Sequence, residues 1–86
     1  MKRLTTEKGH IAYKTSLAEV LSWGGLGICD SCNEFHPEGG YVVPVLNWWM
    51  CEKCFKEWIT RAIHYPEDDQ YERQVASYYE KILKVE

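Results

Sequence analysis

Four cysteines, arranged as two C-x-x-C pairs, constrain this chain more than any other feature of its sequence. The 86-residue chain contains no further cysteine, and eighteen residues separate the two pairs. This spacing is typical of a site in which four thiolates bind one Zn²⁺, because each short turn presents two sulfurs on one side of the backbone. We therefore expect one structural zinc ion per chain. The predicted ligands are Cys29, Cys32, Cys51 and Cys54.

Other uses of the cysteines have to be weighed against zinc. A redox pair needs one C-x-x-C between a strand and a helix of a βαβ unit, and it gives no role to a second pair. Disulfides are disfavoured, because the first residues lack the apolar stretch of a signal peptide and no segment is apolar enough to span a membrane. These features predict a cytoplasmic protein with reduced thiols. Iron in a tetrahedron of sulfurs, and free cysteines that only pack, remain as alternatives.

The segment in front of the cysteines, residues 1–27, is expected to contain short elements only. Residues 1–14 predict a short strand or a hairpin. Ser16 and Glu19 have the spacing of a capping box, which predicts a short helix over residues 16–23. Two consecutive glycines follow this helix and favour its end there.

Residues 28–64 predict a tight turn, a β-hairpin and a helix in that order. The turn carries the first cysteine pair, and residues 41–50 read as two short strands. A helix is expected from Glu52 and should stop before Pro66, because the residue before a proline avoids the helical conformation. One apolar stripe follows the helical spacing: Phe55, Trp58, Ile59, Ala62 and Ile63.

Residues 66–86 are predicted to form the last helix. A proline and three acids suit the start of a helix, where the dipole favours negative charge; the acids are Glu67, Asp68 and Asp69. Apolar residues then repeat at helical spacing: Tyr71, Val75, Tyr78, Tyr79, Ile82 and Leu83.

The central part of the chain resembles the treble-clef zinc-finger group. The resemblance covers residues 28–64 and rests on a knuckle (ICDSCN), a hairpin (YVVPVLNWWM) and a helix start (CEKCFKEW). It implies that the knuckle supplies the first two zinc ligands and the first turn of the helix supplies the last two. We therefore expect a small α+β fold, a treble-clef core with one flanking helix on each side, as a single domain over residues 1–86. Treble clefs serve in nucleic-acid binding, protein docking and nuclease work, so the resemblance implies no single function.

Charge favours a protein partner over a nucleic acid. Residues 23–50 contain Asp30, Glu34 and Glu38 but no Lys or Arg, and the net charge is −3. Nucleic-acid binding depends on cations that neutralise phosphates. We therefore expect a zinc-binding module, not an enzyme, that docks a protein as an adaptor or regulator. The alternative is a nucleic-acid-binding regulator that uses Lys2, Arg3, Lys8, Lys14, Lys53, Lys56 and Arg61.

The histidines are predicted to lie outside the zinc site. His10, His36 and His64 find no free coordination place once four cysteines complete the tetrahedron. We expect them to be surface or hydrogen-bonded residues, with His36 close enough to the cysteines to orient a ligand. A treble-clef nuclease would need a histidine and further ligands around a second, open metal, and the sequence offers no such set.

Two neighbouring tryptophans are predicted to divide between the core and the surface. Trp48 and Trp49 fall in the predicted hairpin, where successive side chains point to opposite faces. The sequence leaves open which indole enters the core, and Tyr78 and Tyr79 present the same choice on the last helix. An outward aromatic side chain would be a candidate hot spot for a protein partner.

Overall fold

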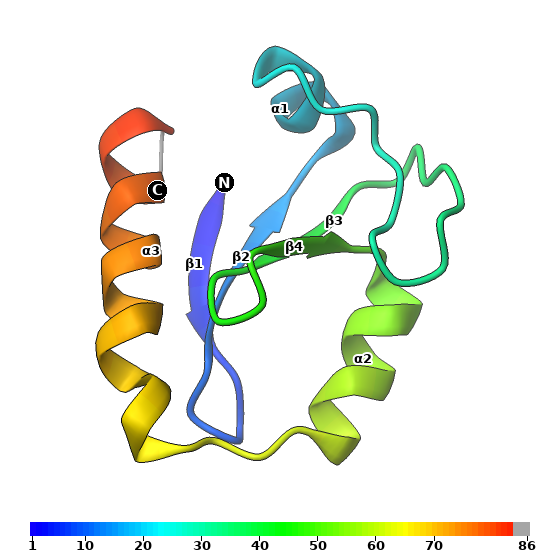
Figure 1. Ribbon diagram of the computed structural model, residues 1–86. Coiled ribbons are helices and arrows are strands. Elements are labelled where there is room, and N and C mark those ends of the chain that lie inside the picture. Colours follow the sequence, from blue (N-terminus) through cyan, green and yellow to red (C-terminus); the bar gives the residue numbers. More distant parts are fainter. Residues whose placement is uncertain (84–86) are drawn as a thin grey trace.

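The computed structural model describes residues 1–83 and confirms an α+β fold (Figure 1). Its centre is a four-stranded antiparallel sheet whose strands follow one another in chain order. The strands are β1 (Lys2–Thr5), β2 (Ile11–Thr15), β3 (Gly40–Val43) and β4 (Trp48–Met50). The helices are α1 (Leu17–Ser22), α2 (Glu52–Arg61), the 3₁₀ helix η1 (Pro66–Asp68) and α3 (Asp69–Ile82). Within residues 1–83 there is no helix with the length and apolar character needed to cross a bilayer.

Both faces of the sheet are covered, so consecutive residues of its central strands are buried on opposite faces. Ala12 and Val43 belong to a core cluster that includes α2. Tyr13 and Val42 belong to a second cluster with Ala76 of α3. Because neighbouring strand residues point to opposite faces, α2 and α3 pack on opposite sides of the strands, as Figure 1 shows.

The N-terminal segment forms the expected hairpin and then extends the sheet. β1 and β2 pair from Lys2↔Lys14 onward, and β2 continues into β3 through Thr15↔Gly40. The pairing of β2 with β3 was not predicted. It joins the N-terminal hairpin and the hairpin between the cysteine pairs into one sheet.

The capping box of α1 is confirmed. The Glu19 N–H donates to Ser16 Oγ at 3.2 Å, and the Ser16 N–H donates to the Glu19 carboxylate at 3.0 Å. These bonds satisfy two backbone donors at the start of a helix that is only six residues long.

Helix α2 ends earlier than its apolar stripe predicted. The backbone leaves the helical conformation at Ala62, so the stripe no longer applies to Ile63, which is 64% exposed. The prediction that Ile63 joins the buried face is therefore wrong. The loop of the β1–β2 hairpin contacts the chain where α2 ends. The Lys8 ammonium donates to the Ala62 carbonyl at 3.5 Å, and His10 packs against His64.

Helix α3 begins later than predicted and buries part of the predicted stripe, because Tyr79 and Leu83 pack against the second core cluster. Pro66 opens the 3₁₀ helix η1, and α3 itself begins at Asp69. Its buried residues are Glu72 and Ala76, whereas Tyr71, Tyr78 and Ile82 of the predicted stripe are exposed. The predicted end of this helix at residues 84–86 lies outside the described residues.

Polar contacts explain which face of α3 meets the sheet. The Tyr13 hydroxyl donates to the Glu80 carboxylate at 2.6 Å, and the Ile11 N–H donates to the Glu72 carboxylate at 3.2 Å. Ala76 lies between these two glutamates in sequence, and its small side chain allows close approach to β2. Two hydrogen bonds and one small residue therefore act together with the packing of Tyr79 and Leu83 to orient the helix.

The tryptophan pair divides as expected. Trp49 is partly buried, contacts both core clusters and donates from Nε1 to Thr15 Oγ1 at 2.9 Å. Trp48 is the outward residue, with 43% of its surface exposed. On α3, Tyr79 points inward and its hydroxyl donates to the Asn47 side-chain oxygen, whereas Tyr78 is exposed.

Candidate metal centre

The first cysteine pair lies in a tight turn that backbone hydrogen bonds hold closed. The Asn33 N–H donates to the Cys29 carbonyl at 2.8 Å, and the Cys29 N–H donates to the Glu34 carbonyl at 3.0 Å. Asn33 has a φ of 61°, a left-handed conformation that asparagine tolerates better than most residues. The N–H groups of Ser31 and Cys32 both approach the Cys29 sulfur, at 3.4 and 3.5 Å.

The second cysteine pair forms the start of α2. Cys51 is the N-cap residue, and its sulfur accepts the Cys54 N–H at 3.5 Å. Cys54 therefore lies in the first turn of the helix, as predicted. The positive end of the helix dipole favours a thiolate at this position.

Strand β4 connects the two pairs. The Asp30 N–H donates to the Trp49 carbonyl, and the Trp49 N–H donates to the Asp30 carboxylate, both at 2.9 Å. This reciprocal pair fastens the first turn to β4, and Cys51 follows the last residue of that strand. In Figure 1 the loop that contains residues 29–34 accordingly reaches the beginning of α2.

The two turns bring all four predicted ligands together. The sulfur atoms of Cys29, Cys32, Cys51 and Cys54 lie within 4.8 Å of one another, and all four cysteines are free thiols. Four zinc–sulfur bonds of about 2.3 Å in a tetrahedron place the sulfurs about 3.8 Å apart, so the cluster has the size of a site that closes around one ion. Cys29 and Cys51 are buried within the core cluster on the α2 side of the sheet. The cluster can therefore hold one metal ion as part of the core.

The thiols differ in how readily they ionise. Burial raises the pKa of the Cys54 thiol to about 12, and its hydrogen bond to Cys51 acts in the same direction. Burial would also raise the pKa of Cys29, but the N–H groups of Cys32, Cys51 and Ser31 outweigh it and lower the pKa to about 6. Neighbouring thiolates repel one another, so a divalent cation is needed before all of them can ionise together.

His36 lies beside the cysteines and is hydrogen-bonded, as predicted. Its Nε2 is 3.4 Å from the Cys32 sulfur, and its Nδ1 is 2.9 Å from the Glu38 carboxylate. The contact with Cys32 and then the one with Glu38 raise the pKa of the imidazole. Cys32 is the exposed member of the cluster, and this histidine restricts the orientation of its side chain.

A second group of ligand-type side chains was missed at the sequence level. His64, Asp69 and Glu72 place one ligand atom each within 4.8 Å of one another. No motif joins them, because the group depends on how the segment after α2 folds against α3. This set was therefore not among the sites predicted from the sequence.

Comparison with known proteins adds no assignment. No protein-family model, curated protein or solved structure matches the chain. The candidate site is therefore assigned from its own geometry and chemistry.

Proposed function

We propose that the cysteine cluster binds one structural Zn²⁺ and that the chain is a zinc module with a treble-clef core that docks a protein partner. The convergence of four thiols from two hydrogen-bonded turns carries this proposal. Four protein ligands complete a tetrahedron and leave no position open for a substrate, which is the arrangement of structural zinc sites. The ion would therefore stabilise a surface, and we do not assign the module a reaction. Free thiols require a reducing environment, which supports the cytoplasm as its compartment.

The surface that the zinc would stabilise is apolar at its centre. Leu26, Ile28 and Phe35, here called the knuckle patch, are 70%, 43% and 57% exposed. Ile28 and Phe35 pair across the turn that carries the first cysteines, and Leu26 and Ile28 line a hollow of about 290 Å³. Large apolar side chains that gather at the surface of a small protein are typical of interaction sites.

Charge around the knuckle patch indicates the chemistry of its partner. Asp30 lines the same hollow, and Glu34 and Glu38 follow in the same loop, where Lys and Arg are absent. We infer that the partner is a protein segment with an apolar anchor flanked by cations. An adaptor or regulator that recognises such a segment fits this surface.

Nucleic-acid binding, the alternative function, has less support. Three of its seven candidate cations are engaged within the chain: Arg3 with Glu80 at 3.0 Å, Lys56 with Glu52 at 3.4 Å and Lys8 with the Ala62 carbonyl at 3.5 Å. The remaining cations are distributed over the N-terminal hairpin and α2. A phosphate backbone requires cations gathered on one face.

Zinc content tests the metal assignment directly. Protein purified without affinity-tag metal is expected to retain about one equivalent of zinc in the cysteine site after dialysis. Substitution with Co²⁺ should produce the intense absorption of a cobalt–thiolate bond, and Cys54→Ser should weaken that absorption. A red protein with iron bound to sulfur, or a folded protein without thiolate-bound metal, would contradict the assignment.

The docking surface is tested by a variant that removes its apolar centre. We expect Phe35→Ser to weaken binding of a captured partner by at least tenfold. The control Ile63→Ser changes a similarly exposed apolar residue outside the patch and should leave binding unchanged. The measurement is isothermal titration at 50 and 200 mM salt. RNA or DNA binding at 200 mM salt that depends on Lys53 and Arg61 would instead favour the alternative function.

A further inference from the structure

A cluster of potential metal ligands lies at the end of the sheet where α2 leads into α3. Its members are His64, from the segment that follows α2, and Asp69 and Glu72, from the first turn of α3. His10, at the start of β2, packs against His64 with the ring centroids 5.1 Å apart. The cluster shares no residue with the cysteine site.

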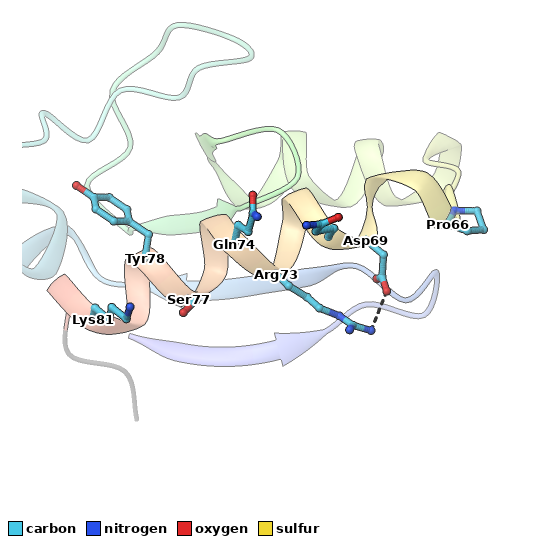
Figure 2. A pocket seen from close by; sticks show the side chains of 8 residues that line it. Pro66, Asp69, Arg73, Gln74, Ser77, Tyr78 and Lys81 are labelled. Atoms are coloured by element: carbon cyan, nitrogen blue, oxygen red, sulfur yellow. Dashed lines mark ion pairs between the residues drawn. The ribbon is translucent and has the colours of Figure 1, made fainter.

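Each carboxylate presents one free oxygen to the same imidazole nitrogen. Asp69 Oδ2 pairs with Arg73 at 2.8 Å, as the dashed line in Figure 2 marks, and Asp69 Oδ1 lies 3.7 Å from His64 Nε2. The Ile11 N–H donates to Glu72 Oε2 at 3.2 Å, and Glu72 Oε1 lies 4.0 Å from the same nitrogen. Outer partners that hold one oxygen and orient the other are a regular feature of carboxylates that bind metals.

The distances within the cluster suit a bridging ion better than direct hydrogen bonds. Separations of 3.7 and 4.0 Å exceed hydrogen-bond length. Two metal–ligand bonds of about 2.1 Å can span at most about 4.2 Å. An ion bound by His64 Nε2 and the two oxygens would draw them closer together, because tetrahedral or octahedral bonds of about 2.1 Å place ligand atoms about 3.0–3.4 Å apart.

Glu72 has too few partners for a buried carboxylate. Its side chain is 3% exposed, and its only hydrogen bond among the described residues comes from the Ile11 N–H. Burial of a charged group requires a counter-charge or several hydrogen bonds. His64 is the nearest cationic candidate at 4.0 Å, while Arg73 is engaged by Asp69 and Lys8 by the Ala62 carbonyl.

His10, which packs on Trp58 and His64 beside the cluster, carries a buried atom without a partner among the described residues. The residue is 3% exposed, and its Nδ1 is buried without a hydrogen-bond partner within residues 1–83. Buried polar atoms almost always have a partner, and a water molecule bound to a cation beside His64 would provide one.

We propose that His64, Asp69 and Glu72 form a second metal site, which binds a divalent transition-metal cation. One imidazole and two carboxylates suit Mn²⁺, Fe²⁺ or Zn²⁺ rather than the soft ions that select thiolates. Three protein ligands leave coordination positions for water, in contrast to the closed cysteine site. The His64 and Asp69 side chains are 29% and 38% exposed, so an ion would reach the cluster directly from solvent.

The test uses the full chain, with zinc in its cysteine site, titrated with Mn²⁺ and followed by the electron paramagnetic resonance of free Mn²⁺. We expect one saturable Mn²⁺ per chain that Zn²⁺ displaces. Asp69→Asn and Glu72→Gln should each weaken this binding at least tenfold. Asp69 is half-exposed, so its variant remains informative even if replacement of buried Glu72 destabilises the fold.

Glu67→Gln is the matched control, because it removes an equal charge from the neighbouring turn without touching the cluster. Its Mn²⁺ affinity should equal that of the wild type. Absence of saturable Mn²⁺ or Zn²⁺ uptake beyond the cysteine site, or equal affinity in Asp69→Asn, would overturn the proposal. Mn²⁺ avoids thiolates, so this outcome is distinguishable from failure of the cysteine site to bind zinc.

Discussion

Removal of the metal from the cysteine site is expected to abolish the cooperative unfolding transition of the protein. Structural zinc contributes an apparent binding free energy of ~10–16 kcal/mol, whereas a typical domain is stable by only ~5–15 kcal/mol in total. Cys29 and Cys51 are also members of the core cluster on the α2 side of the sheet. Without the ion, ionised cysteines would repel one another inside that core. Cysteines that stay protonated would instead remain buried there as thiols. Circular dichroism during heating, with and without a strong chelator, measures the effect.

Two variants make the metal experiment specific. Cys54→Ser removes one proposed ligand and should reproduce the effect of the chelator. His36→Gln changes a residue that contacts the Cys32 sulfur without belonging to the cysteine set, and it should retain a cooperative transition. A chelated protein that unfolds at an unchanged temperature would mean that the sheet and its helices are stable alone.

Phe55→Ala is expected to lower the free energy of unfolding of the metal-bound protein by about 3–5 kcal/mol, the usual range for loss of a buried aromatic ring. Phe55 is 4% exposed and follows Cys54 in the first turn of α2. Its ring stacks on Tyr41 of β3 with the centroids 4.1 Å apart. The variant therefore removes the contact by which α2 packs on the sheet and positions the second cysteine pair.

Ile63→Ala is the matched control for Phe55→Ala. Ile63 belongs to the same apolar stripe in the sequence but is 64% exposed, so its loss should change stability by no more than about 0.5 kcal/mol. Urea unfolding at saturating zinc compares the two variants. Similar losses from both would indicate that α2 extends beyond Arg61 in solution and buries Ile63.

Features that depend on a few neighbouring residues could be predicted from the sequence. The capping box of Ser16 and Glu19 and the position of Cys54 in the first turn of α2 are both confirmed. Each follows from local backbone sterics or from hydrogen bonds within three or four residues. The spacing of the cysteines likewise predicted one cluster, because few geometries satisfy two C-x-x-C turns at once.

Features that depend on distant segments were decided by the tertiary structure alone. The pairing of β2 with β3, the buried face of α3 and the outward position of Trp48 follow from how the sheet aligns its strands and which helix covers each face. On α3, Glu72 and Ala76 lie on the buried face, whereas Tyr71 and Tyr78 of the predicted apolar pattern are exposed.

The proposed second metal site illustrates the same division. His64, Asp69 and Glu72 form no motif, and His10 lies more than fifty residues before them in the chain. They meet because α2 ends at Arg61 and because Glu72 is held by the backbone of β2. The spacing of the cysteines indicated by itself a cluster that can hold a metal ion, since that spacing is a local property. Only the packing of α3 against β2 could bring a histidine and two carboxylates to one point, since that contact joins segments whose pairing no short-range preference specifies.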